Sequence, residues 1–144
     1  MKIIEGNLLE IEKGVMVHQV NCQKIAGAGL ALQIRNKWPQ WYKDFILYPN
    51  PHLGNVQLFH VREELWIANL YAQDRYGKDG KCYTDYQAFG VCLKWIRDNL
   101  YFHGQMFYFP YKIGCGWAGG DWNIISGLIE KELPEAMIVR LPNG

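Results

Sequence analysis

Short apolar runs alternate along this chain with longer segments whose apolar residues recur at helical spacing. The short runs predict strands, because turn-forming residues bound them. They span residues 2–5, 15–20, 56–61, 65–71, 105–109 and 136–141. Strands that alternate with helices in this way predict an α/β domain with a mixed, mostly parallel central sheet.

The longer segments predict helices at residues 27–38, 84–100 and 122–133. In the first, Leu30 and Ile34 lie one turn apart, and Pro39 ends the helix because proline cannot continue it. Residues 41–47 predict a further helical turn. Asp121 precedes the last helix and is expected to cap it.

The clearest helical pattern covers residues 84–100. Thr84 is expected to cap this helix, and Gln87 stands where a capping box places Glu or Gln. An apolar stripe runs along one face, and we interpret it as core. Its members are Phe89, Cys92, Leu93, Ile96 and Leu100.

The most informative stretch is PYKIGCGWAGGDW, residues 110–122, between a predicted strand and a predicted helix. Four glycines fall within seven residues there: Gly114, Gly116, Gly119 and Gly120. Glycine lets the backbone adopt positive φ and approach a ligand closely. Free N–H groups and partial positive charge at a helix start favour phosphate. The stretch therefore predicts a diphosphate-containing ligand held largely by backbone.

A second glycine loop, HQVNCQKIAGAGLAL at residues 18–32, precedes the first predicted helix. Gly27 and Gly29 flank Ala28 between strand and helix. One such loop is weak evidence, because tight turns also use glycine for packing. In an open α/β sheet, however, ligands bind outside the carboxyl ends of the strands. Two loops at that edge can clamp opposite sides of a diphosphate and a ribose.

Composition restricts the classes of function. The 144 residues, 49% hydrophobic and 20% charged, fit one globular domain with a core of its own. A net charge of +1 with scattered Lys and Arg argues against binding nucleic acid through a strong electrostatic footprint, although a nucleic-acid end can still be a substrate. No apolar stretch has the length of a membrane span, and the N-terminus lacks a signal-peptide core, so we expect a cytoplasmic protein.

Motif spacing argues against several familiar sites. The cysteines form no C-x-x-C pair, so we expect free thiols and no zinc. The chain lacks G-x-x-x-x-G-K-[ST], and GAGLAL lacks the third glycine of G-x-G-x-x-G. Cys115 opens a glycine loop as a nucleophile would, but Asp121 at the end of that loop would repel phosphate. A small packing residue is the simpler interpretation of Cys115.

With both loops considered, the chain resembles the macrodomains, the ADP-ribose-binding α/β/α modules, over essentially its whole length. IIEGNLLE resembles their first strand and adenine-contacting turn, VNCQKIAGAGLALQI their first binding loop, and PYKIGCGWAGGDW their diphosphate loop. The resemblance implies a single three-layer α/β/α domain over residues 1–144. Within the superfamily, the chain is most similar to the branch of fungal-type ADP-ribose-1″-phosphate phosphatases and terminal ADP-ribose protein glycohydrolases.

By motif position, the resemblance implies three groups of ligand-binding residues. Those at the adenine end are Asn7 and Leu8. Those around the distal ribose are Asn21, Gln23, Gly27, Ala28 and Gly29. Those that wrap the diphosphate and the ribose beside it are Ile113, Gly114, Cys115, Gly116 and Trp117.

Two positions depart from the pattern of the glycohydrolases in this branch. Those enzymes use a lysine just after the central strand predicted to end near Tyr71, where this chain has Ala72 and Gln73. They also use an aspartate in the diphosphate loop, where this chain has Ala118. Asp121 follows only further along the loop. The Asn-Cys-Gln sequence with G-x-G is closer to the phosphatase pattern.

His18, Asn21 and Asp121 are the candidate catalytic residues. An imidazole at His18 can protonate a leaving group or activate water. Asn21 can orient a ribose hydroxyl or water, and Asp121 can act as a general base or orient water. Each also has a structural alternative, which is a hydrogen-bonded histidine, a loop-holding amide and a helix N-cap, respectively.

The sequence thus predicts an enzyme that binds ADP-ribose and hydrolyses a derivative, either ADP-ribose-1″-phosphate or an ADP-ribosyl group on a protein or nucleic acid. The alternative is a non-catalytic reader or scavenger of ADP-ribose. We expect a monomer with no metal or cofactor. Lys24 is a candidate contact for a terminal phosphate, Gln73 a weaker candidate for orienting water, and Tyr76 or Trp117 can cover the ligand.

Overall fold

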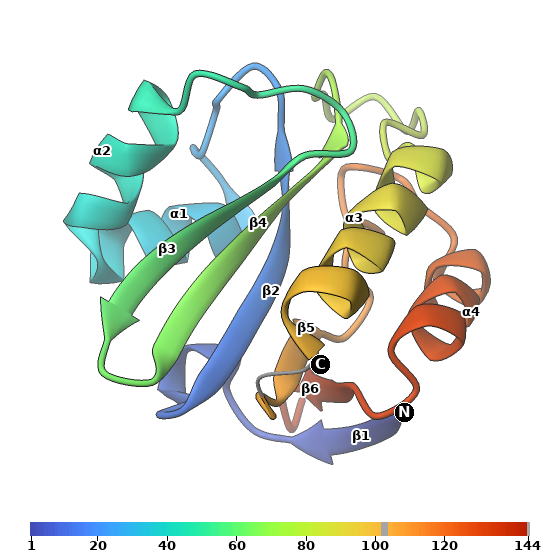
Figure 1. Ribbon diagram of the computed structural model, residues 1–144. Helices are drawn as coiled ribbons and strands as arrows, with labels where there is room; N and C mark the ends of the chain where they lie inside the picture. The colour runs from blue at the N-terminus through green and yellow to red at the C-terminus, as the bar shows by residue number, and fades with distance from the viewer. Residues whose placement is uncertain (102–103, 144) are drawn as a thin grey trace.

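A six-stranded sheet forms the centre of the protein, in the order β1-β6-β5-β2-β4-β3 (Figure 1). The computed structural model describes residues 1–101 and 104–143. The strands are β1 Lys2–Glu5, β2 Gly14–Asn21, β3 Val56–Arg62, β4 Leu65–Gln73, β5 Phe107–Pro110 and β6 Met137–Arg140. Strand β3 pairs antiparallel with β4, and the other neighbours pair in parallel. The predicted mixed, mostly parallel sheet is confirmed.

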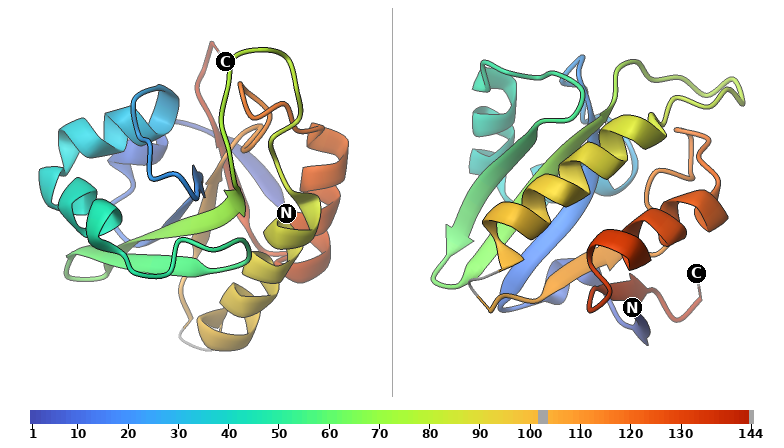
Figure 2. Two further views of the ribbon diagram at one scale, coloured as in Figure 1. Left: turned by 90° about the horizontal axis from the view of Figure 1, so that it is seen from above. Right: turned by 45° about the vertical axis from the view of Figure 1, so that its right-hand side comes forward.

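Helices cover both faces of this sheet. They are the 3₁₀ helix η1 Leu8–Glu10, followed by α1 Gly29–Lys37, α2 Pro39–Leu47, α3 Tyr86–Asn99 and α4 Trp122–Glu132. Figure 2 shows α1 and α2 on one face and α3 and α4 on the other. The result is the expected three-layer α/β/α arrangement.

The central strand β2 supplies both cores by the alternation of its side chains. Val15 and Val17 belong to the buried cluster under α3 and α4. Met16 and Val20 belong to the cluster under α1 and α2. Residues 15–17 of β2 are apolar on both faces of the sheet. Nearer the carboxyl end of the strand, His18 and Gln19 place polar side chains on opposite faces.

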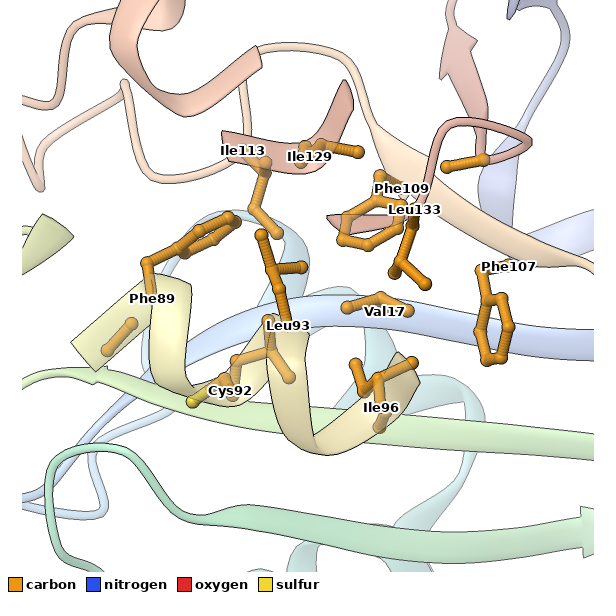
Figure 3. Packing of buried hydrophobic residues seen from close by; sticks show 14 of the residues in the cluster. Val17, Phe89, Cys92, Leu93, Ile96, Phe107, Phe109, Ile113, Ile129 and Leu133 are labelled. Carbon is orange, nitrogen blue, oxygen red and sulfur yellow. The ribbon is translucent and has the colours of Figure 1, made fainter. Parts of the chain in front are cut away.

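The apolar stripe of α3 packs between the sheet and α4. Figure 3 shows Phe89, Leu93 and Ile96 among side chains of the sheet and of α4, such as Phe109 and Ile129. All five of these side chains are fully buried. Burial of each contributes about 1.5–3 kcal/mol relative to exposure, so this face is a principal source of stability. The interpretation of the stripe as core is confirmed.

One predicted helix cap is wrong, and one predicted helical turn is confirmed as part of a longer helix. Asp85, not Thr84, caps α3, because the Asp85 side chain accepts a hydrogen bond from the Ala88 backbone N–H. The Thr84 hydroxyl instead donates to the carbonyl of Gly114 in a distant loop. Residues 41–47 belong to a nine-residue helix, α2, whose first residue is Pro39. Proline ends α1 but also suits the first position of the next helix, since no intrahelical partner is needed for its nitrogen.

Free thiols are confirmed at Cys22, Cys82, Cys92 and Cys115. Within residues 1–101 and 104–143, no helix combines the length and apolar character needed to cross a membrane. The predicted caps, strands and helices otherwise agree with the structure to within a few residues. Asp121 caps α4 as predicted, since its side chain accepts from the Asn123 N–H.

Candidate functional site

A cleft of about 780 Å³ opens at the carboxyl ends of β2 and β5. Its walls are the end of β2, residues 25 and 27–31, residues 76–78, and residues 110–114 and 116–118. The left view of Figure 2 looks down on this edge of the sheet, where the loops that follow β2, β4 and β5 gather. This volume falls in the range of pockets that hold small molecules and cofactors.

The loop between β2 and α1 is held by side-chain hydrogen bonds. Asn21 Nδ2 donates to the Ile25 carbonyl at 2.9 Å, and the Ile25 N–H donates to Asn21 Oδ1 at 3.1 Å. Lys24 Nζ donates to the carbonyls of Ile46 and Tyr48 at the end of α2, at 3.2 and 2.6 Å. Both side chains are therefore engaged in shaping the loop. Lys24 does not point a free charge at a terminal phosphate.

The start of α1 presents backbone N–H groups to the cleft. Its N-cap is Ala28, so no side chain in the described part of the chain caps this helix. Gly29, Leu30 and Ala31 occupy its first turn, where N–H groups lack intrahelical partners, and all three line the cleft. A Cβ added at Gly27 or Gly29 would meet no atom within 4 Å. The helix terminus is thus open to an approaching anion.

The loop after β5 is shaped by crowded glycines. Gly114 has φ 73° and Gly119 has φ 72°, a region that favours glycine. The Gly114 carbonyl accepts from the Thr84 hydroxyl at 2.7 Å and from the Gly120 N–H at 2.8 Å. A Cβ on Gly119 would lie 2.4 Å from the Lys81 carbonyl oxygen. The loop folds tightly on itself and on residues that precede α3.

Gly116 differs from the other glycines of this loop. Its backbone, like that of Gly120, lies outside the left-handed region, but a Cβ on Gly116 would meet nothing within 4 Å. Gly116 also lines the cleft. Its missing side chain therefore leaves space on the ligand side of the loop, as at Gly27 and Gly29 on the opposite wall.

A network of uncharged polar side chains lies under the second loop. Gln19 Nε2 donates to Gln73 Oε1 and to Thr84 Oγ1, both at 3.0 Å. The Thr84 hydroxyl in turn donates a hydrogen bond to the Gly114 carbonyl. Gln19 Oε1 is buried and has no hydrogen-bond partner among the described residues. The network ties the central strand to the loop and positions Gly114.

The charges around the cleft favour an anion. Lys78 and Lys112 line it, and none of its lining residues, all of them in the described part of the chain, is acidic. Lys78 Nζ lies 4.0 Å from the centre of the Trp117 ring, a cation–π contact that spans two walls. Trp117 and Tyr76 are 55% and 53% exposed. A bound phosphate would therefore meet positive charge and backbone N–H groups, with aromatic side chains at the rim.

The structure brings most of the predicted ligand-binding residues to this cleft. Those that line it are Asn21, Gly27, Ala28, Gly29, Ile113, Gly114, Gly116 and Trp117. Asn7, Leu8, Gln23 and Cys115 are not among the lining residues.

The two residues expected at the adenine end have local structural roles. Asn7 caps η1, and its Oδ1 accepts from the Leu9 N–H at 3.0 Å. Leu8 is buried in the core under α1 and α2. Their sequence motif is thus explained by the turn that follows β1.

Gln23 and Cys115 also form contacts outside the cleft. Gln23 Nε2 donates to Asp74 Oδ1 at 3.2 Å on the surface. The thiol of Cys115 lies 3.4 Å from the Ile113 carbonyl. Burial, and then the nearby Asp121 carboxylate, raise the pKa of Cys115. A protonated thiol with this placement fits the packing interpretation of Cys115 and not that of a nucleophile.

His18 lines the cleft, but its side chain is only 3% exposed. Its Nε2 lies 2.6 Å from Asn69 Oδ1. Burial lowers the pKa of His18 to about 4, although the hydrogen bond to Asn69 opposes that shift. The imidazole is therefore neutral near neutral pH. This geometry disfavours His18 as a proton donor to a leaving group.

Asn21 and Asp121 are occupied as well. Both ends of the Asn21 amide bond to the backbone of Ile25. The Asp121 carboxylate caps α4 at 2.8 Å from the Asn123 nitrogen, and Asp121 is not among the lining residues. The geometry thus favours the structural alternative for both residues.

Known proteins were compared with this chain by sequence and by structure. No protein-family model and no curated protein matches it. A protein of unknown function from Bacteroides thetaiotaomicron has a similar structure, with a TM-score of 0.82, 28% identity and coverage of 97% of this chain and 96% of that one. A macrodomain protein from Streptomyces coelicolor matches with a TM-score of 0.75, 24% identity and coverage of 96% and 97%. This chain has the macrodomain fold.

A third similar structure is Thermosipho africanus DarTG in complex with ADP-ribose. It matches this macrodomain fold with a TM-score of 0.76 and 18% identity, over 98% of this chain and 42% of that chain. The similarity therefore covers one part of a longer protein. The predicted resemblance to macrodomains is confirmed at the level of the fold.

Sequence reasoning missed several residues of the cleft. Lys78 and Lys112 supply its positive charge, and Gln19 and Thr84 support its second loop. Gln19 carries a detectable signal, since it is one of the polar residues that follow the apolar residues 15–17 in the central strand. The two lysines carry none, because scattered surface lysines are common in any soluble domain.

Proposed function

We propose that this macrodomain binds ADP-ribose in the cleft between the start of α1 and the loop after β5. The observation that carries the proposal is the pair of open glycine walls. Gly27 and Gly29 on one side and Gly116 on the other leave space for a ligand that approaches the backbone closely. The complex of DarTG with ADP-ribose, on a similar fold, supports this ligand.

In the proposed complex, the diphosphate lies between the two walls. Backbone N–H groups in the first turn of α1 donate to it from one side, and those of Gly114 and residues 116–118 donate from the other. Lys78 and Lys112 add long-range attraction without a competing carboxylate at the cleft. Trp117 and Tyr76, at the rim, cover the ligand, because both expose large aromatic surfaces.

The second candidate is hydrolysis of an ADP-ribose derivative, either ADP-ribose-1″-phosphate or an ADP-ribosyl group on a protein or nucleic acid. The observation that favours it is the placement of His18 at the cleft, where an imidazole nitrogen can hold a water molecule. With the phosphate ester, water attacks phosphorus, the bond to the ribose oxygen breaks, and ADP-ribose and inorganic phosphate leave. Asn21 and Asp121 have other partners, so binding without turnover is the better-supported function.

Calorimetric titration with ADP-ribose tests the binding proposal. We expect saturable one-to-one binding, and weaker binding of AMP, which lacks the second phosphate and the second ribose. No heat of binding at ligand concentrations well above those of the protein would overturn it.

Turnover is tested separately. The protein is incubated with ADP-ribose-1″-phosphate, and released phosphate is measured, with ADP-ribosylated protein and DNA as further substrates. A reader leaves all three unchanged. Release of phosphate or ADP-ribose that is lost in His18→Ala would instead establish the hydrolase.

A further inference from the structure

A closed network of buried polar groups lies between β2, β4 and α2, behind the first wall of the cleft. Asn69 is at its centre and is fully buried. Asn69 Oδ1 lies 2.6 Å from His18 Nε2 and 2.9 Å from Trp41 Nε1. Asn69 Nδ2 donates to Gln57 Oε1 at 3.1 Å. The side chains thus bind one another on the face of the sheet that α1 and α2 cover.

The chemistry of the partners determines the role of each atom. An indole nitrogen can only donate, so the atom of Asn69 that faces Trp41 must be the amide oxygen. The same oxygen faces His18 Nε2, which must therefore carry a hydrogen and donate it. In a neutral imidazole, Nδ1 is then unprotonated and can only accept a hydrogen bond.

The unprotonated nitrogen has a use at the cleft. His18 lines the cleft, and no protein hydrogen bond reaches Nδ1 from residues 1–101 or 104–143. Gln19 Oε1 is the fully buried side-chain atom that lacks a partner among these described residues, so His18 Nδ1, which also lacks one, is not fully buried. Because the cleft is the cavity that His18 lines, we infer that Nδ1 faces it. A buried network that is otherwise complete therefore ends in one acceptor at the ligand side.

We propose that Trp41 and Asn69 hold His18 in the Nε2–H tautomer, so that Nδ1 accepts a hydrogen bond from a hydroxyl of the bound ligand. The inference rests on the proposed function, in which that hydroxyl belongs to a ribose of ADP-ribose. His18 is the residue that contacts the ligand, and Asn69 and Trp41 are positioning residues that act through it.

The electrostatics of the network agree with this assignment. Burial lowers the pKa of His18 to about 4, so Nδ1 stays unprotonated near neutral pH. The groups that face the ring are Asn69 from β4 and Trp41 from α2, whose ring centre lies 5.5 Å from that of His18. Neither group is charged, and no charged side chain is among the causes of the His18 shift. Burial also raises the pKa of Tyr71, further along the network, so this phenol stays neutral.

The tautomer is tested on the free protein by heteronuclear NMR, which distinguishes protonated from unprotonated ring nitrogens. We expect a protonated Nε2 and an unprotonated Nδ1 in His18 that persist through the pH range in which an ordinary histidine titrates. The opposite tautomer, or a charged ring at neutral pH, would overturn the proposal without bearing on whether ADP-ribose binds.

The contact with the ligand is tested by calorimetry with ADP-ribose on a matched pair of variants. His18→Phe keeps a planar ring but removes the acceptor, and we expect about tenfold weaker binding, the value of one neutral hydrogen bond. His18→Asn retains an amide oxygen near the position of Nδ1, and we expect less than about a threefold loss. Asn69 keeps its bond from Trp41 in both variants, so thermal unfolding should show that both fold.

The positioning role is tested by a double-mutant cycle with Asn69→Ala. Without Asn69 the His18 ring loses its fixed tautomer, and we expect binding several-fold weaker in the wild-type background but unchanged in the His18→Phe background. Equal affinity of wild type and His18→Phe would overturn this inference alone. Absence of binding by the wild type would overturn the proposed function itself. If Asn69→Ala does not fold, the NMR assignment and the His18 pair still decide.

Discussion

Glycines in the loop after β5 pack against the protein's own atoms, whereas those in the loop before α1 face open space. A Cβ on Gly119 would lie 2.4 Å from the Lys81 carbonyl oxygen, and one on Gly114 would lie 2.8 Å from Gln19 Oε1. Gly27 and Gly29 have no such neighbour within 4 Å. Gly29, with φ 58°, also serves the backbone conformation of its loop, but its side-chain position, like that of Gly27, leaves room for a ligand. In the crowded loop, Gly116 shares this opening.

The supports of the two loops differ in the same way. The loop before α1 is shaped by its own side chains, since Asn21 bonds to Ile25 within it. The loop after β5 is held by side chains outside it, since Gln19 bonds to Thr84 and Thr84 bonds to the Gly114 carbonyl. Adjacent residues of β2 stand behind these two walls, because His18 and Gln19 face opposite sides of the sheet. Substitutions in the two loops, and at the side chains behind them, should therefore affect the free energy of unfolding and the affinity for the ligand to different extents.

The largest effect is expected for Gly119→Ala. The alanine must adopt φ near 72° and would press its Cβ against a backbone carbonyl, so we expect a loss of about 4 kcal/mol in the free energy of unfolding. Chemical denaturation measures it. Gly27→Ala is the matched change in the open loop and should alter this free energy by less than about 0.5 kcal/mol. Equal losses in the two variants would refute the contrast between the loops.

The pH dependence of stability tests the wall behind the first loop. The pKa of His18 is about 4 in the folded protein, below the ordinary value of 6.5, so the unfolded chain binds this proton more readily. Stability is fully present above pH 6.5 and falls as the pH drops toward 4. Over that window, we expect the wild type to lose about 3 kcal/mol more than His18→Phe, measured by urea unfolding at each pH. Parallel curves for the two proteins would contradict a buried neutral imidazole.

Gly116→Glu places bulk and negative charge in the open part of the second wall. We expect at least about a hundredfold weaker binding of ADP-ribose, because the side chain occupies the diphosphate space and repels it. Calorimetry measures the affinity. Gly127→Glu is the control, since Gly127 in α4 also has nothing within 4 Å but lies away from the cleft. An unchanged affinity in Gly116→Glu would remove the diphosphate from this wall.

The smallest effect is expected for Thr84→Val, which keeps the shape of the side chain and removes the hydroxyl. The Gly114 carbonyl loses its bond from Thr84 but keeps that from Gly120. We expect a loss of about 1 kcal/mol in stability and about threefold in affinity, because Gly114 is less firmly held. Thr84→Ser retains the hydroxyl and should restore both. If the valine variant instead behaves like the wild type and the serine variant is weakened, packing of the methyl group and not the hydrogen bond supports the loop.

Much of the fold could be predicted because local patterns are consistent with it. Apolar runs predict every strand of the sheet, and the stripe on α3 predicts its buried face. Thr84 was predicted as a cap because threonine suits that position, yet Asp85 fulfils the role and Thr84 bonds to Gly114. The residues around Thr84 could not reveal this, since the carbonyl that its hydroxyl binds belongs to Gly114, 30 residues further along the chain.

The candidate site also has features that follow from the local sequence and features that depend on the packing of the chain. The two glycine-rich junctions and their place at the carboxyl edge of a parallel sheet follow from strand and helix periodicity, which is a local property of the sequence. Burial and hydrogen-bond partners are not local. Asn21 and Asp121 carry suitable chemistry, but the neighbours that occupy them, and the bulk that keeps His18 neutral, appear only when the chain is packed.

By itself, then, the sequence determined an α/β domain with glycine loops suited to a diphosphate. Only the tertiary structure decided which glycines face a ligand and which face the protein, because the atoms around Gly114 and Gly119 come from Gln19 and from residues 81–84. It also decided the tautomer of His18, since Trp41 and Asn69 lie on different elements that meet only in the folded core. Periodicity specifies which residues are buried, whereas the direction of a hydrogen bond depends on the partners that folding brings within reach.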